Sequence, residues 1–66
     1  NGMRVLGDAE GIVIKNAKQD EIINVYLLNG QLVRSIRITG SNERIALPSG
    51  EIYLIKTETH TIKIRL

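Results

Sequence analysis

The alternation of apolar and polar residues along short segments is the feature that most constrains the fold of this chain. β-branched residues are frequent in these segments, Phe and Trp are absent, and helical spacing of apolar residues has almost no support. A period of two is the pattern of a strand that buries one face. We therefore expect strands at residues 3–6, 11–16, 21–28, 31–38, 43–47, 52–57 and 61–66.

Turn-forming residues separate the expected strands. Examples are Asn29-Gly30, residues 40–42 and residues 48–50. These segments consist of Gly, Pro, Asn and Ser, the residue types that are most frequent in turns. A length of 66 residues allows one domain, spanning residues 1–66. Short strands at this spacing are typical of a sandwich or barrel. We expect an all-β fold, a small antiparallel β-sandwich of the immunoglobulin-like kind with about seven strands.

The central hairpin is expected to turn at Asn29-Gly30. Asn-Gly is the preferred pair of a type I′ two-residue turn, because both positions need positive φ. This turn pairs Leu27 with Leu32. Further along it pairs Ile23 with Ile36. A slip of one residue would exchange buried and exposed faces, so the pattern favours this register.

The last hairpin is expected to turn at Glu58-Thr59. This turn pairs Ile55 with Ile62, and Tyr53 with Ile64. The predicted core then contains Ile12, Ile14, Ile23, Val25, Leu27, Ile45, Leu47, Tyr53, Ile55, Ile62 and Ile64. Ile52 and Leu54 fall on the outer face among charged residues, where either simple exposure or cover by a neighbouring chain explains them.

No combination of residues predicts catalysis or metal binding. His60 is the only histidine and the chain has no cysteine. His60 lacks partners at zinc-ligand spacing and has no nucleophile beside it, so we interpret it as a solvated turn residue. The acidic residues fall mostly at turns or strand starts, where turn chemistry explains them. We expect a protein that is not an enzyme, with no cofactor and no concave site of about 300 Å³ or more.

The charge is mildly basic. Nine Lys and Arg stand against seven Asp and Glu, a mixed balance that argues for neither nucleic acid nor a membrane. Tyr26 and Tyr53 are the only aromatic residues, whereas an oligonucleotide-binding barrel usually offers more stacking platforms. No apolar run approaches the roughly 18 residues of a membrane span. We expect no nucleic-acid partner and no direct membrane insertion.

Three segments resemble a known family. Residues 25–33 read VYLLNGQLV, residues 47–56 read LPSGEIYLIK and residues 61–66 read TIKIRL. In this order they resemble the C-terminal secretion and sorting domains of Bacteroidetes surface proteins, the cargo tails of the type IX (Por) secretion system. Residues 11–17 also resemble the first strands of a related Bacteroides C-terminal β domain. The family's Tyr-Pro-Asn-Pro opening is missing, Gln31 replaces an arginine, and Glu51 is one extra residue, which predicts a bulge.

The resemblance implies a function that the composition does not. It implies a non-catalytic domain at the C-terminus of a larger exported protein, secreted or on the outer-membrane surface of a Gram-negative cell. Its partner would be the outer-membrane secretion machinery. The residues expected to be recognised are Gly50, for its backbone, and the exposed charges Lys56, Lys63 and Arg65. The alternative is an accessory binding module that packs on its own upstream domain, an adhesin or a carbohydrate-active domain, through Ile52 and Leu54.

Overall fold

The computed structural model describes residues 2–66, and within them every regular element is a strand. The strands are β1 (Arg4–Asp8), β2 (Gly11–Lys15), β3 (Ile22–Leu27), β4 (Leu32–Arg37), β5 (Asn42–Ala46), β6 (Ile52–Lys56) and β7 (Thr61–Arg65). Each coincides with an expected segment, and the ends differ by no more than two residues.

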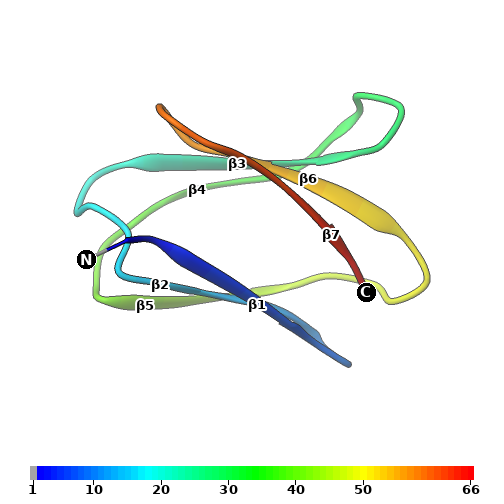
Figure 1. Ribbon diagram of the computed structural model, residues 1–66, viewed down its shortest axis with the longest axis horizontal. Coiled ribbons are helices and arrows are strands. Elements are labelled where there is room, and N and C mark those ends of the chain that lie inside the picture. Colours follow the sequence, from blue (N-terminus) through cyan, green and yellow to red (C-terminus); the bar gives the residue numbers. More distant parts are fainter. Residues whose placement is uncertain (1) are drawn as a thin grey trace.

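The strands form two antiparallel sheets that pack face to face (Figure 1). Sheet A has the order β1-β2-β5, and sheet B has the order β4-β3-β6-β7. In Figure 1 sheet B lies above sheet A, with β1 and β7 toward the viewer. The structure confirms the predicted all-β fold of a small antiparallel sandwich.

The core lies between the two sheets and is entirely apolar apart from one tyrosine hydroxyl. Its buried side chains are Ile12, Ile14, Ile23, Val25, Ile38, Ile45, Leu47, Tyr53 and Ile55. All but Ile38 belong to the predicted core. The sequence prediction missed Ile38, which is brought inward because its N–H donates to the Glu21 carbonyl at 2.9 Å and so prolongs the pairing beyond β4.

The sequence predicted that Leu27, Ile62 and Ile64 belong to the core. In the structure they are only half-buried and lie at its margin. Leu27 ends β3 beside the hairpin turn. Ile62 and Ile64 belong to β7, which forms an edge of sheet B. A side chain on an edge strand has neighbours on one side only, so its burial stays incomplete.

The central hairpin turns differently from the prediction. The Leu27 N–H donates to the Gln31 carbonyl at 2.8 Å, and the Gly30 N–H donates to the Leu27 carbonyl at 2.9 Å, so the loop holds three residues. Gly30 has φ 95°, but Asn29 is not among the described residues with positive φ. The predicted type I′ turn, which needs positive φ at both positions, is therefore wrong. The Asn29 side chain instead accepts a bond from the Gln31 N–H at 3.0 Å, which supports the longer loop.

A bulge at Val33 compensates for the longer loop. Tyr26 pairs with Leu32 but Val25 pairs with Arg34, so Val33 is an extra residue in β4. Beyond the bulge the register is the predicted one. Val33 packs against the core and Leu32 is 50% exposed, whereas the predicted pairing with Leu27 placed Leu32 on the buried face. The predicted pairing of Leu32 with Leu27 is accordingly wrong.

The last hairpin has the predicted register. Ile55 lies opposite Ile62, as expected. At its open end the Gly50 N–H donates to the Leu66 carbonyl at 2.8 Å, and the Leu66 N–H donates to the Glu51 carbonyl at 3.1 Å. Two residues thus oppose one, which confirms the predicted bulge at Glu51. Gly50 has φ 90°, a conformation that favours glycine at the first position of such a bulge.

Candidate functional site

Three of the four predicted recognition residues lie together on the outer face of sheet B. Lys56 ends β6, while Lys63 and Arg65 belong to β7, and all three are exposed. Lys63 lies opposite Leu54, and Arg65 lies opposite Ile52. Since successive side chains in a strand point to opposite faces, these residues project away from the core.

Gly50, the fourth predicted residue, lies apart from this face. It is in the turn between β5 and β6, where its N–H holds the carbonyl of Leu66. Its positive φ matches the backbone role that the sequence predicted. The structure therefore gives Gly50 a supporting position at the end of the last strand and no place in the charged surface.

The register extends the same surface across the whole of sheet B. The outward positions of its strands are Ile22, Asn24, Tyr26, Leu32, Ser35, Arg37, Ile52, Leu54, Lys56, Thr61, Lys63 and Arg65. Among these described strand positions, four carry a positive charge and none carries a carboxylate. We call this surface the cationic face, defined by Arg37, Lys56, Lys63 and Arg65. The prediction of recognition residues missed Arg37, although the Ile23–Ile36 register already placed it outward.

Apolar and aromatic side chains lie at the centre of the cationic face. Tyr26 lies opposite Leu54 on the neighbouring strand, and both are half-buried. The Lys56 ammonium lies 5.7 Å from the centroid of the Tyr26 ring, within the range of a cation–π contact. Ile52 continues this apolar centre toward Arg65. A partner that docks here would meet apolar side chains beside the positive charges.

The outer face of sheet A carries charges of both signs, since Arg4 lies opposite Lys15 and Asp8 forms an ion pair with Arg44. Arg44 Nη2 lies 2.8 Å from Asp8 Oδ2, and Arg44 Nη1 lies 3.8 Å from Glu10 Oε1. The hydrogen bond from Arg44, together with that from the Glu10 N–H, lowers the pKa of the Asp8 carboxyl. Asp8 Oδ1 also accepts from the Gly11 N–H at 3.0 Å, so this acid closes the β1–β2 turn. Turn chemistry explains Asp8, as the sequence predicted.

The cations of sheet B differ from Arg44 because their charge is not matched within the domain. In residues 2–66 the ion pairs within 4.0 Å are those of Arg44 with Asp8 and Glu10. An exposed cation without such a pair keeps its full charge for an approaching anionic group. Among the described residues, the four cations of the cationic face therefore have no ion-pair partner within 4.0 Å.

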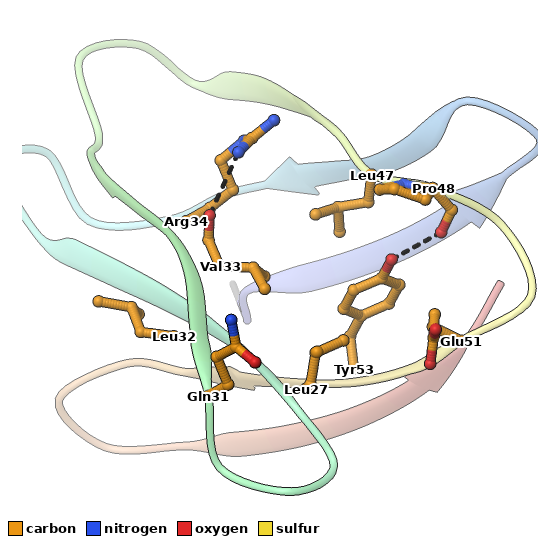
Figure 2. Close-up of a pocket in the computed structure, with 9 residues that line it drawn as sticks. All are labelled: Leu27, Gln31, Leu32, Val33, Arg34, Leu47, Pro48, Glu51 and Tyr53. Carbon is orange, nitrogen blue, oxygen red and sulfur yellow. Dashed lines mark hydrogen bonds between the residues drawn. The ribbon is translucent and has the colours of Figure 1, made fainter.

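A cavity of about 470 Å³ opens between β4 and the turn at residues 47–51 (Figure 2). Its lining comprises Leu27, Gln31, Leu32, Val33, Arg34, Leu47, Pro48, Glu51 and Tyr53. A second cavity of about 400 Å³ is lined by Gly7, Asp8, Ala9, Ser49, Ile64, Arg65 and Leu66. The expectation that no concavity exceeds about 300 Å³ is wrong. Val33, the bulge residue of β4, is among the residues that line the larger cavity.

Two polar side chains of the larger cavity, Tyr53 and Arg34, form hydrogen bonds within the protein. Figure 2 shows the Tyr53 hydroxyl directed at the Pro48 carbonyl, at 2.7 Å, and Arg34 Nη1 directed at the Val33 carbonyl, at 3.2 Å. Burial raises the pKa of Tyr53, the Glu51 charge adds to this, and the Arg34 charge opposes it. Tyr53 therefore remains a neutral donor to Pro48, which gives this group a structural role.

His60 lies in the exposed turn between β6 and β7, where the sequence placed it. Its N–H donates to Thr57 Oγ1 at 3.0 Å, and its Nδ1 lies 2.8 Å from Thr59 Oγ1. Over the described residues, no three His, Asp or Glu side chains come together as a metal site would require. The same part of the chain contains no helix of the length and hydropathy needed to cross a membrane.

Comparison of the chain with protein-family models, with curated proteins and with solved structures gave no match. Fold and surface together define a small all-β domain whose candidate site is an open sheet face.

Proposed function

We propose that this domain is a non-catalytic sorting or surface-attachment domain at the C-terminus of a larger exported protein. The observation that supports the proposal is the exposure of Lys63 and Arg65 on a last strand that is itself ordered. This strand closes the series of segments that resembles the type IX cargo tails. The recognition partner would be the outer-membrane secretion machinery.

One side of the last strand packs against the core, and the other side is exposed to solvent. Ile62, Ile64 and Leu66 pack against the core and hold β7 in place. Lys63 and Arg65 alternate with them and face solvent. In the mechanism that the resemblance implies, the translocon binds this strand, and the domain is then removed as the cargo is attached to surface polysaccharide.

A reporter fusion tests the proposal. We expect residues 1–66, fused to the C-terminus of a secreted reporter, to bring it to the surface of a bacterium that has the type IX system. Lys63→Glu with Arg65→Glu should reduce surface display while leaving the fold intact, since exposed substitutions usually change stability by no more than about 0.5 kcal/mol. The matched control is Arg4→Glu with Lys15→Glu, an exposed pair of facing cations on sheet A.

Comparison of the two double variants shows whether surface display depends on Lys63 and Arg65 in particular or on the net charge of the domain. Loss of display in both would mean that export depends on net charge and not on the cationic face. Normal display after removal of residues 51–66 would reject the sorting role altogether, because that segment holds Lys56, Lys63 and Arg65.

An accessory module that packs on its own upstream domain is the second candidate. The apolar centre of the cationic face favours it, because Ile52 and Leu54 keep partial exposure there. Calorimetry of the full-length protein distinguishes the candidates. A packed module should unfold together with its neighbour, and Ile52→Thr with Leu54→Thr should separate the two transitions. A sorting domain should unfold independently in both proteins.

A further inference from the structure

One side of β7 has no hydrogen-bonded strand, although β1 of sheet A contacts β7 across the sandwich. Sheet B ends at β7, and β6 occupies its other side. Hydrogen bonds at the two ends of the hairpin show which main-chain groups face β6. The Thr57 N–H donates to the His60 carbonyl at 2.9 Å, and the Leu66 N–H donates to the Glu51 carbonyl at 3.1 Å. Hydrogen-bonded and non-hydrogen-bonded pairs alternate along an antiparallel ladder.

This alternation gives the direction of each main-chain group in β7. His60 and Leu66 are both hydrogen-bonded positions, and the register between them is continuous, so positions 62 and 64 are bonded to β6 as well. The N–H and C=O groups of Thr61, Lys63 and Arg65 therefore point away from β6. They form a regular row of donors and acceptors along the free edge.

The opposite edge of sheet B lacks this regularity. In β4 the bulge at Val33 interrupts the spacing, and Arg34 Nη1 covers the Val33 carbonyl with a bond of 3.2 Å. Bulges and charges are two devices by which edge strands avoid pairing with other chains. The β6–β7 register shows no shift from Thr61 to Arg65, so along β7 itself only charge protects the edge.

The smaller cavity lies beside this free edge. Ile64 and Leu66 of β7 contribute to its lining, and Gly7 and Ala9 contribute from the end of β1. Ile64 and Leu66 lie against Gly7 of β1 but stay half-buried, so part of their apolar surface remains open on the inner side of the edge. An inward side chain of a strand added next to β7 would cover this surface and occupy part of the cavity of about 400 Å³.

We propose that β7 is a strand acceptor whose free edge pairs with an extended peptide in which acidic and apolar residues alternate. Main-chain bonds to Thr61, Lys63 and Arg65 would provide affinity, as in other cases of strand addition. The acidic side chains would lie on the outer face beside Lys63 and Arg65. The apolar side chains would lie on the inner face over Ile64 and the smaller cavity. Strand acceptance follows from the edge geometry alone and holds whether or not the domain is a sorting signal.

A second copy of the domain fits this edge poorly. Antiparallel pairing of two β7 strands would bring Lys63 and Arg65 of one copy beside the same residues of the other. Like charges directly opposite each other destabilise a strand pair. Charge complementarity therefore favours an acidic segment over self-association.

Amide exchange measured by NMR tests the proposal. In the free domain the amides of Lys63 and Arg65 should exchange faster than those of Ile62 and Ile64, which are bonded to β6. A capped peptide with a Glu-Val repeat should slow exchange at Lys63 and Arg65 and leave Ile62 and Ile64 unchanged. Slow exchange at Lys63 and Arg65 without peptide would overturn the proposal, because the edge would not be free.

Charge and main-chain pairing are tested separately with two further peptides. A Lys-Val repeat should bind about tenfold more weakly than the Glu-Val repeat, because it meets Lys63 and Arg65 with like charge. A Glu-Val peptide N-methylated along one edge should bind only through its unmodified edge, and one N-methylated along both edges should not bind. Equal binding of the Glu and Lys peptides, or full binding after methylation of both edges, would overturn strand acceptance.

Variants of the domain complete the test. Lys63→Glu with Arg65→Glu should reverse the preference, so that the Lys-Val peptide binds about tenfold better than the Glu-Val peptide. Arg4→Glu with Lys15→Glu on sheet A is the matched control and should retain the original preference. If the control reverses the preference as well, net charge and not the β7 edge determines binding, and the proposal fails.

Discussion

The hydroxyl of Tyr53 donates a hydrogen bond of 2.7 Å to the main-chain carbonyl of Pro48. Tyr53 belongs to β6 and is 1% exposed, whereas Pro48 lies in the turn that leads into this strand. The same turn contains Gly50, whose N–H holds the carbonyl of Leu66. The bond thus connects the core to the turn that supports the end of the chain.

Tyr53→Phe removes this bond and keeps the ring. We expect the free energy of unfolding to fall by about 0.5–1.5 kcal/mol, because water can reach the exposed turn and hydrate the Pro48 carbonyl. Urea unfolding followed by circular dichroism measures the change. Tyr26→Phe on the cationic face is the control and should stay within about 0.5 kcal/mol of the original domain. Equal losses in the two variants would show that the Tyr53–Pro48 bond contributes nothing specific.

The Asp8 carboxyl should make stability depend on acidic pH. The hydrogen bond from Arg44 lowers its pKa below the ordinary value of 3.8, so the folded state favours the charged form. The resulting stabilisation is fully present above about pH 4, and it is lost as the pH falls through 3.8 and then through the lowered pKa. Urea unfolding at a series of pH values should show a shallower acid dependence for Asp8→Asn. An unchanged slope would mean that Arg44 does not hold Asp8 in solution.

Gly11→Ala should disrupt sheet A. Gly11 has φ 150°, and a Cβ there would overlap the Ile45 carbonyl oxygen and lie 2.8 Å from the Leu47 nitrogen. We expect a loss of at least about 1–3 kcal/mol, because β2 and β5 must move apart. Thermal unfolding measures this loss. Gly40→Ala is the control, since a Cβ at that position meets nothing within 4 Å. A Gly11→Ala domain as stable as the control would contradict the close approach of the strands.

Shortening an apolar side chain should lower the free energy of unfolding more at the centre of the core than in the edge strand β7. Ile12 has no exposed surface, so Ile12→Ala should cost about 2–5 kcal/mol. That loss would unfold most of a domain whose total stability is about 5 kcal/mol. Ile62→Ala should cost less, because Ile62 is only half-buried. Denaturant midpoints of the two variants give the comparison, and an equal effect would place Ile62 in the core.

In the central hairpin the register was predictable from the sequence, but the turn was not. Alternation of residues was sufficient to predict the pairing of Ile23 with Ile36, because only that register buries one apolar face. The turn itself was not predictable from Asn29-Gly30. Two-residue and three-residue loops are both common in hairpins, and here the Val33 bulge absorbs the extra residue. Val33 is among the residues that line the larger cavity, and neither the bulge nor the cavity has a signal in the sequence.

The sequence by itself determined the β character of the chain, the positions of its strands and the outward direction of Lys56, Lys63 and Arg65, because these properties depend on residues that are near neighbours along the chain. Only the tertiary structure decided the order of strands in each sheet, and with it which edge of β7 is free. Strand order depends on how two apolar faces pack against each other. Such long-range contacts leave no period in the sequence.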